Sequence, residues 1–493
     1  MIRNFLLFSV LLISFSLHSQ KYTTPGTGVH WTLDSLVEIS LSTVSFSDAV
    51  YTIHEELELA VTDTLVLRPG DHVLIDSALA VRVSGVFLSQ GSEGNEVVID
   101  AVDSLKPYNG FRFEDVSTAV FDYSIVKNGG GLKLITENVK VTNSQFLYNT
   151  KGTLATGAVL DLSYGSPLIT NNRFIRNAKP AVSSPANRTV SAKIINNYLE
   201  GNNQLNENRP QLNMGTTGKD TLVIKGNVII GDRTKERVGA IAVSNLLNSP
   251  DGIVTVIEDN TMRDNRYGMT IAGGNAYALI KDNVIEDNDT EGKPNLGGSG
   301  ISLNAGANTQ DIIITGNEIR RNLWGITIIG QASANLGDDS FQGNNIFSEN
   351  GNDGVVYALY NNTANTISAK GNCWIEGKES TLEEAGKVIF DVADDSKLGE
   401  VVYDPILCGV TVATEDITSA LPSFYPNPAH DRIYFAGIKD IKKVNIISLD
   451  GRKLYSKDIN ENTEHIQFNL LLGIYIVEFE NVNQKFSQKL IVE

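Results

Sequence analysis

The side chains that exchange protons most readily near neutral pH are unevenly placed along this chain. Histidine is the usual acid–base residue in that range, and residues 73–429 contain none. The gap excludes a histidine base, a histidine-activated nucleophile and a histidine-ligated zinc ion from the middle of the chain. The six histidines are His18, His30, His54, His72, His430 and His465.

Paired carboxylates are the next candidates for chemistry. The segment "NLGDDSFQGN" (335–344) contains the adjacent residues Asp338 and Asp339. Glycoside hydrolases usually use two carboxyl groups for catalysis. Adjacent residues of a strand, however, point to opposite faces, and the preceding glycine and following polar run favour a turn. A similar run, "VADDSKLGE" (392–400), is interpreted as an acidic end cap. We therefore predict no catalytic residue at either place.

A basic cluster stands out on an acidic chain. The formal net charge is −18, which argues against nucleic acid as a partner and against simple electrostatic capture of an acidic polymer. The segments "NNQLNENRPQLN" (202–213) and "DRTKERVG" (232–239) nevertheless carry several cations. We hypothesise that these cations bind an extended glycan or surface polymer, and the alternative is that the loops are simply solvated. The residues concerned are Arg209, Arg233, Lys235 and Arg237.

A recurring phrase indicates which elements position these residues. "ITNNRFIRN" (169–177) returns in variant form at 194–202, 257–265, 280–288 and 314–322. When the copies are aligned on an Asn, an apolar residue follows two positions later and often a second Asn five positions later. The Asn recurs every 23 to 34 residues. We predict a structural ladder made of Asn172, Asn197, Asn227, Asn260, Asn283, Asn317, Asn344 and Asn372.

Each copy is followed by a short strand pattern that begins with glycine. "GAIAV" (239–243), "GISL" (300–303) and "GITI" (325–328) alternate apolar and other residues with a period of two, which indicates strands. Coils this short cannot bury their apolar side chains alone, so they must stack. The pattern predicts an all-β fold: a right-handed parallel β-helix (solenoid), followed by a small antiparallel β-sandwich. Asn tolerates the left-handed turn conformation, and stacked side-chain amides bond to one another.

The phrase resembles the repeats of the right-handed parallel β-helix family over roughly residues 110–410. We assign residues 21–110 to an N-terminal cap and the first β-helix coils, and residues 111–410 to the β-helix with its Asn ladder. A third long segment, "NDTEGKPNLGGSG" (288–300), leaves the same corner of the coil as the two basic segments. Loops inserted on one face of a solenoid often form its binding face.

The resemblance also implies an enzymatic alternative. Polysaccharide lyases on this fold commonly use Arg or Lys as the base, often with calcium, and the candidates here are Arg263, Arg266, Arg320 and Arg321. Because Arg263, Glu286 and Arg320 recur at one position of successive coils, a surface salt-bridge ladder is the favoured interpretation. We predict no catalytic residue, no metal ligand set and no cofactor, with loose calcium binding at the turns left open.

The N-terminus and the two cysteines indicate export. Arg3, the apolar run 5–17 and the small residue Ser19 predict a signal peptide at residues 1–20, and no other run approaches the length of a membrane-spanning helix. In an exported protein, two cysteines are the count for one disulfide. We predict that Cys373 bonds to Cys408, the alternative being two buried thiols.

After a linker at 411–420, residues 421–493 read as short antiparallel strands with a tight Asp450-Gly451 turn. They strongly resemble the C-terminal sorting domain (type A) of the type IX secretion system of Bacteroidetes-like bacteria; a carbohydrate-binding or spacer sandwich is the alternative. The resemblance implies the type IX machinery as a partner and a secreted, extracellular or surface-attached location. The matching residues are Tyr425, Pro426, Asn427, Pro428, Gly451, Gly473 and Tyr475.

Together these features predict a secreted cell-surface β-helix protein. We expect a non-catalytic adhesin or glycan-binding protein whose partner outside the cell is a polysaccharide. The alternative is a polysaccharide lyase or a related carbohydrate-active enzyme on the same scaffold. Nucleic acid and a membrane-spanning segment are not expected.

Overall fold

The computed structural model describes residues 21–408, apart from 151, 307–309 and 379, and most of 423–492. The chain divides into two compact units, Met1–Gly409 and Val410–Glu493. The expected signal peptide (1–20) and linker (411–420) lie outside the described residues, as do Pro426, Asn427, Pro428 and Gly451. The further gaps in the second unit are 437–440, 449–450, 461–462, 464, 471–472 and 482–484.

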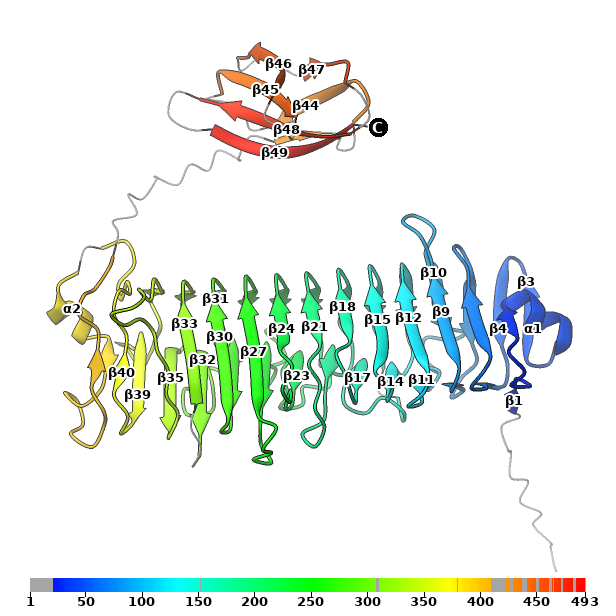
Figure 1. Cartoon of the computed structure of the whole chain (residues 1–493), viewed down its shortest axis with the longest axis horizontal. Helices are drawn as coiled ribbons and strands as arrows, with labels where there is room; N and C mark the ends of the chain where they lie inside the picture. The colour runs from blue at the N-terminus through cyan, green and yellow to red at the C-terminus, as the bar shows by residue number, and fades with distance from the viewer. Residues whose placement is uncertain are drawn as a thin grey trace, which may run out of the picture. The chain divides into compact units, whose positions relative to one another are not determined.

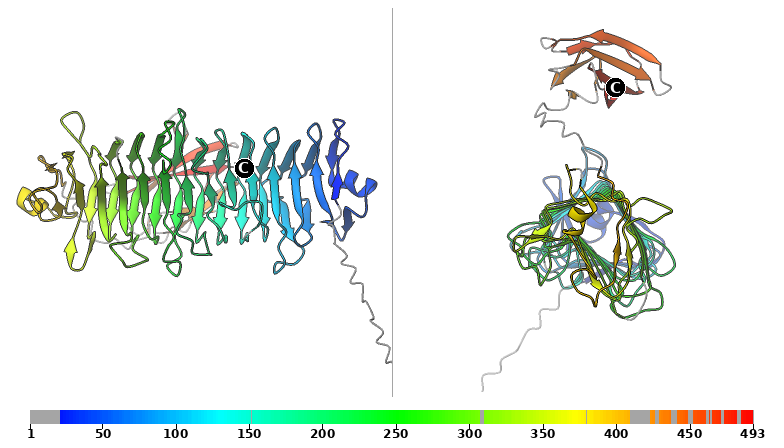
Figure 2. Two further views of the ribbon diagram at one scale, coloured as in Figure 1. Left: turned by 90° about the horizontal axis from the view of Figure 1, so that it is seen from below. Right: turned by 90° about the vertical axis from the view of Figure 1, so that its left-hand side faces the viewer.

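The first unit is a parallel β-helix whose chain visits three long sheets, here named A, B and C, once in each coil (Figure 1). Seen end-on, the coils superimpose into one ring (Figure 2). All the strand pairs of these sheets are parallel except β3 with β4. Successive coils therefore hydrogen-bond through their main chains, and within the described strands of these three sheets only β3 and β4 pair as neighbours in sequence.

Sheet A has 14 strands. They are β1 (Lys21–Thr23), β5 (Glu56–Leu59), β8 (Ala80–Val83), β11 (Gly110–Phe113), β14 (Leu132–Leu134), β17 (Leu160–Leu162), β20 (Val182–Ser183), β23 (Leu212–Met214), β26 (Ile241–Ser244), β29 (Met269–Ala272), β32 (Ser299–Ala305), β35 (Trp324–Gly330), β39 (Leu359–Thr363) and β41 (Ile389–Phe390).

Sheet B has 11 strands. They are β2 (His30–Thr32), β6 (Thr64–Leu67), β9 (Val86–Gln90), β12 (Thr118–Asp122), β15 (Asn138–Thr142), β18 (Leu168–Thr170), β21 (Lys193–Ile195), β24 (Leu222–Lys225), β27 (Ile253–Glu258), β30 (Ala276–Lys281) and β33 (Gln310–Thr315). Single bridges at Asn335 continue it to the pair β40 (Ile367–Ser368) and β42 (Val401–Val402).

Sheet C has 13 strands. They are β3 (Val44–Ser47), β4 (Val50–Ile53), β7 (His72–Ile75), β10 (Val97–Ala101), β13 (Ser124–Lys127), β16 (Gln145–Leu147), β19 (Arg173–Ile175), β22 (Tyr198–Glu200), β25 (Val228–Ile230), β28 (Thr261–Arg263), β31 (Val284–Glu286), β34 (Glu318–Arg320) and β36 (Ile346–Ser348). A short hairpin, β37 (Gly351–Asn352) with β38 (Val355–Val356), follows it.

A column of buried amides runs along the corner between sheets B and C. The side-chain oxygen of each Asn accepts two hydrogen bonds from the Asn of the preceding coil, one from its main-chain N–H and one from its side chain. For Asn197, these bonds come from Asn172 at 3.0 and 2.9 Å. The amide also donates to a strand carbonyl of the preceding coil, as Asn197 does to Ile169 at 2.9 Å. The column contains Asn172, Asn197, Asn227, Asn260, Asn283, Asn317, Asn345 and Asn372.

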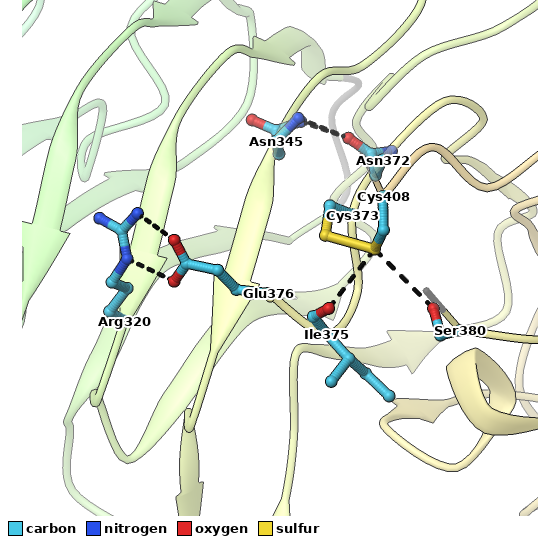
Figure 3. Close-up of a disulfide and its surroundings, with 8 residues drawn as sticks. All are labelled: Arg320, Asn345, Asn372, Cys373, Ile375, Glu376, Ser380 and Cys408. Carbon is cyan, nitrogen blue, oxygen red and sulfur yellow. Dashed lines mark hydrogen bonds and ion pairs between the residues drawn. A yellow bond between two sulfur atoms is a disulfide. The ribbon is translucent and has the colours of Figure 1, made fainter. Parts of the chain in front are cut away.

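The sequence alignment places one member of this column wrongly. Asn345, not Asn344, accepts from Asn317. Asn345 also donates to Asn372 (Figure 3). Asn344 is exposed and occupies the left-handed conformation with φ 51°. The residue before a ladder Asn commonly takes that conformation, as Asn171 and Asn196 do, so the positive φ belongs to the position before the ladder. In "GNNIF" the buried Phe347 is the apolar partner, and Phe347 is two residues after Asn345.

A second amide column runs along the corner between sheets C and A. It contains Asn149, Asn177, Asn202, Gln211, Asn265, Asn288, Asn322 and Asn350. At one coil the expected position holds Asp232, whose carboxylate cannot donate. Gln211 takes its place, accepting from Asn202 at 2.9 Å and donating to Asn265 at 3.1 Å. The longer Gln side chain thus continues the column from a neighbouring segment.

The interior of the coils is apolar and close-packed. Phe146 and Phe174 stack with ring centroids 5.1 Å apart, and Phe347 stacks on Trp374 at 4.9 Å. One continuous cluster of buried side chains extends from Trp31 to Val401. The apolar column therefore forms a single core that runs the length of the β-helix.

Each end of the stack is closed by a short helix. Helix α1 (Leu33–Ile39) buries Leu33 and Leu36 against the first coils, and α2 (Leu382–Gly386) lies at the other end (Figure 1). The structure places a disulfide between Cys373 and Cys408, 35 residues apart, beside the last ladder amide (Figure 3). No helix in the described parts of the chain has the length and apolar character needed to cross a membrane.

Asp63 attaches the first segment of the chain to the body. Its buried carboxylate accepts hydrogen bonds from the main-chain N–H groups of Gly26, Gly28 and Val29 at 2.9 to 3.0 Å, and from the Trp31 indole at 3.2 Å. Burial by itself would raise its pKa, but bonds from Thr24, Val29, Gly26 and Trp31 lower the pKa from 3.8 to about 2. The segment is thus held most firmly when this carboxylate is ionised.

The second unit contains two antiparallel sheets. One has three strands, β43 (Ser423–Tyr425), β44 (Arg432–Ala436) and β47 (His465–Gln467). The other has four, β46 (Lys453–Asp458), β45 (Lys443–Ser448), β48 (Gly473–Glu480) and β49 (Lys485–Val492). Its separate core includes Ile433, Val444, Ile446, Val477 and Phe479. Tyr475 pairs with Leu490 in the four-stranded sheet.

We predict that the two neighbouring asparagines respond differently to the same change. Asn345→Gly leaves buried donors and acceptors without partners and should lower the free energy of unfolding by about 3 kcal/mol. Asn344→Gly should change it by less than about 0.5 kcal/mol, because glycine takes a positive φ freely. Urea unfolding followed by tryptophan fluorescence measures both. Equal losses of unfolding free energy in the two variants would contradict the assignment of Asn345, rather than Asn344, to the ladder.

A second prediction concerns acid stability. Because the pKa of Asp63 is lowered in the folded state, its contribution is fully present above its ordinary pKa of 3.8 and is lost as the pH falls towards about 2. The thermal midpoint of Asp63→Asn should therefore lie below that of the parent protein at pH 6, and the difference should shrink by pH 2 to 3. A difference independent of pH would contradict this role of the charge.

Candidate functional site

The long loops between sheets C and A gather on one corner of the coil. Segments 202–211, 232–239 and 288–298 connect β22 to β23, β25 to β26 and β31 to β32. The main-chain N–H of Arg237 donates to Asn206 at 2.9 Å, and Arg233 reaches Asp289 at 2.7 Å. The three loops thus touch one another and form a wall beside sheet A.

The four predicted cations lie in the first two of these loops, but they are not equally available. Arg233 bonds to Asp264 at 2.9 Å and to Asp289 at 2.7 Å, and these carboxylates raise its pKa. Arg209 lies 4.0 Å from Glu207. Within the described residues no carboxylate pairs with Lys235 or Arg237. The loops therefore carry less free positive charge than the sequence indicates.

Arg266 ties the wall together. It forms an ion pair with Glu291 at 2.5 Å, and each side chain is only 10% exposed. It also donates to Asn208 at 2.5 Å and to the carbonyl of Leu296. One buried guanidinium thus links loops 202–211 and 288–298. The sequence indicates Arg266 only as a candidate lyase base, because its partner Glu291 lies 25 residues away on another coil.

Two of the other arginines considered as bases are also held by carboxylates. Arg320 makes a two-pronged contact with Glu376 at 2.6 and 2.7 Å (Figure 3), and this hydrogen bonding raises its pKa. Arg321 pairs with Asp287 at 2.8 Å and Glu286 at 2.9 Å, and its pKa is raised chiefly by Asp287. Arg263 lies beside Glu286 of the next coil in the pairing of β28 with β31. Protonated, paired guanidinium groups are unsuited to removing a proton.

The adjacent carboxylates Asp338 and Asp339 occupy a turn. Asp338 accepts from Ser340 at 2.6 Å and from Asn335 at 2.6 Å, and these bonds lower its pKa to about 2. Asp339 is 93% exposed and pairs with Lys370 at 2.7 Å. They line an open hollow of about 720 Å³. In the described part of the chain, no three His, Cys, Asp or Glu side chains are grouped to hold a metal ion.

The outward face of sheet A carries a continuous column of side chains, one from each strand, here called the outer column. Strand pairing places each member beside the next, so their spacing is that of the strands, about 4.8 Å. From β5 to β41 its members are Glu58, Arg82, Arg112, Lys133, Asp161, Ser183, Asn213, Ala242, Thr270, Ser302, Thr327, Tyr360 and Phe390.

Several members of the outer column are buried although they point away from the core. Asp161 is 5% exposed, Ser183 4% and Thr327 5%. Asp161 accepts from Lys133 at 3.0 Å and from the main chain of Gly157 at 3.0 Å, and Thr327 bonds to Ser299 at 2.9 Å. The connecting segments therefore lean over this face and partly enclose it.

The C-terminal end of the outer column is aromatic. The ring of Tyr360 stacks on Phe390 at 4.7 Å, and the ring of Trp324 lies 5.1 Å from Tyr360 and 4.6 Å from Tyr357. All four rings are half-buried. The Trp324 indole donates to the carbonyl of Pro294 at 3.1 Å, which joins this aromatic platform to the loop wall.

Sequence reasoning did not find the aromatic platform. Trp324, Tyr357, Tyr360 and Phe390 are successively 33, 3 and 30 residues apart, and they come together through the pairing of β35, β39 and β41. A signal was available, since Thr327 and the residues at the same strand position in later coils could have been aligned.

Two family models match parts of this chain. Residues 423–493 match the family model described as secretion system C-terminal sorting domain, which indicates export by the type IX secretion system to the cell surface or the extracellular space. Residues 251–377 match the model described as protein of unknown function (DUF1565). No curated protein matched the chain.

One solved structure, described as "a new PL6 alginate lyase complex with trisaccharide", is similar to the chain at 14% identity and a TM-score of 0.39. The match covers 83% of this chain and 90% of that one. Similarity at this level supports no statement about the activity of the present chain.

We predict that the wall depends on the buried pair of Arg266 and Glu291. Arg266→Met leaves a buried carboxylate unpaired, which costs about 3 kcal/mol, and should speed amide hydrogen exchange in loops 202–211 and 288–298. Arg237→Met, which removes an exposed cation that has no carboxylate partner among the described residues, should leave exchange in the 288–298 loop nearly unchanged. Equal exchange in the two variants would show that Arg266 does not hold the wall.

Proposed function

We propose that this protein is a non-catalytic glycan-binding protein of the cell surface, and that the glycan lies on the outward face of sheet A. The observation that carries the proposal is the aromatic platform of Trp324, Tyr357, Tyr360 and Phe390 at the end of the outer column. Export by the type IX system, indicated by the sorting domain, supplies the extracellular location that such a function needs.

The platform has the properties that sugar recognition requires. The face of an aromatic ring carries partial negative charge and a large apolar area, and a pyranose offers a face of slightly positive C–H groups. The rings already contact one another at centroid distances of 4.6 to 5.1 Å. Rings held in place in this way lose little conformational entropy when a ligand binds.

Arg209, Arg233, Lys235 and Arg237 belong to the proposal as part of the loop wall. Since Arg233 is paired with two aspartates, the cluster offers Lys235 and Arg237 as its free charges among the described residues. Such rim charges contribute more to the rate of encounter than to affinity. Replacing all four by Ala should change the dissociation constant of a bound glycan by less than about threefold.

A polysaccharide lyase remains the second candidate, favoured by the side-by-side cations Arg82, Arg112 and Lys133 on the outer column. A lyase that cleaves uronate polymers produces an unsaturated sugar with strong ultraviolet absorbance. We expect no rise in absorbance when the protein is mixed with alginate or polygalacturonate. A steady rise that Lys133→Met abolishes would replace the binding proposal with the enzymatic one.

We predict that Tyr360→Ala weakens polysaccharide binding about tenfold, which corresponds to ~1.4 kcal/mol. Tyr277→Ala is the matched control, because Tyr277 is 57% exposed on the outward face of sheet B. Affinity electrophoresis over a panel of polysaccharides measures both, with the thermal midpoint as a check of folding. Equal binding by the two variants would remove the aromatic platform from the site.

A further inference from the structure

The outer column changes character part-way along sheet A. Its first five members, from β5 to β17, are all charged, whereas the eight members from β20 to β41 are all uncharged. The residue two positions further along each of the later strands is also uncharged. This second column contains Ser244, Ala272, Asn304, Ile329 and Asn362.

These two columns form an uncharged strip of hydroxyl, amide and small apolar groups that ends in the aromatic platform. Eight strands at about 4.8 Å spacing give it a length of roughly 34 Å. Asn213, Thr270 and Ser302 are half-buried and accessible to a ligand, whereas Ser183, Ala242 and Thr327 are buried. The strip is long enough to hold several units of an extended polymer laid along the axis of the β-helix.

Several charged groups beside the strip already have partners, whereas Lys235 and Arg237 of the loop wall have none among the described residues. Lys179 pairs with Glu207 at 2.6 Å, and Arg266 pairs with Glu291 at 2.5 Å, both on the loop wall. Asp391, beside Phe390, accepts from the main chain of Val401 at 2.8 Å. At the opposite edge Arg188 stacks over Tyr164 at 4.6 Å. The strip itself holds no charged side chain, so an anionic polymer placed on it would lose hydration there without gaining an ion pair.

We propose that the uncharged strip binds a neutral polysaccharide, laid along the β-helix axis with one end stacked on the aromatic platform. This inference rests on the proposed glycan-binding function and specifies the chemistry of its ligand. Hydroxyl and amide groups both donate and accept, as sugar hydroxyls do. The net charge of −18 repels polyanions but does not affect the binding of a neutral polysaccharide.

The test uses the full-length exported protein with two neutral probes, laminarin and a galactomannan, and two anionic probes, alginate and polygalacturonate. We expect binding to at least one neutral probe, with less than a twofold change in dissociation constant between low and high salt, because no ion pair is formed. Thr270→Asp, which puts a charge in the middle of the strip, should weaken this binding at least tenfold.

Thr170→Asp is the matched control, since Thr170 is a half-buried outward residue of β18 on sheet B. It should bind like the parent protein, and thermal midpoints show that both variants fold. Binding to anionic probes alone, or neutral binding that Thr270→Asp leaves intact, overturns the inference while the glycan-binding function stands. No binding to any probe, or to a wider glycan array, overturns both.

Discussion

The hydrogen bond between side-chain amides of successive coils is the interaction on which this structure depends. An Asn amide carries both a donor and an acceptor, so each residue can accept from the coil before it and donate to the coil after it. The buried Asn197 does so between Asn172 and Asn227 at 2.9 Å on each side. Because each amide also bonds to main-chain groups, it satisfies the polar backbone of a sharp buried corner. Two such columns run along the corners of sheet C.

The columns also explain where variation is tolerated. In the coils from Asn172 to Asn317 the corner between sheets B and C turns within two residues, one with positive φ and one in the ladder, and no loop is inserted there. Between the second column and sheet A the connecting segment can vary in length. Loops 202–211 and 288–298 are the long segments at this place. The buried pair of Arg266 and Glu291 then joins these loops into one wall. A rigid scaffold thus carries a variable edge beside its longest sheet, as is common for binding surfaces.

The outward face of sheet A combines the scaffold and the wall. The strand register places one side chain of each coil above the next, so the column has the fixed period of the sheet. Opposite charges in its charged portion pair with each other, as Lys133 does with Asp161 at 3.0 Å. Its uncharged portion ends at four contacting aromatic rings. Delivery to the cell surface or the extracellular space, indicated by the sorting domain, places this face where polysaccharides occur.

Local pattern was enough to predict the β-helix, its Asn column and the sorting domain, because each depends on residues that are close in sequence and recur. It was not enough to choose between Asn344 and Asn345, since both precede an apolar residue at a permitted spacing. The buried position of Phe347 decides that register. Local pattern also could not show that Gln211 takes the place of Asp232 in the second amide column. Nor could it show that the buried carboxylate of Glu291 pairs with Arg266.

The sequence by itself determined the period, and with it the stacking of coils around an apolar interior. Only the tertiary structure decided which side chains meet, because residues of different coils, such as Tyr360 and Phe390, become neighbours through strand pairing across irregular loops. The loops vary in length from coil to coil, so sequence distance does not measure distance across the sheet. The outward surface, and therefore the candidate site, is a property of the register between coils.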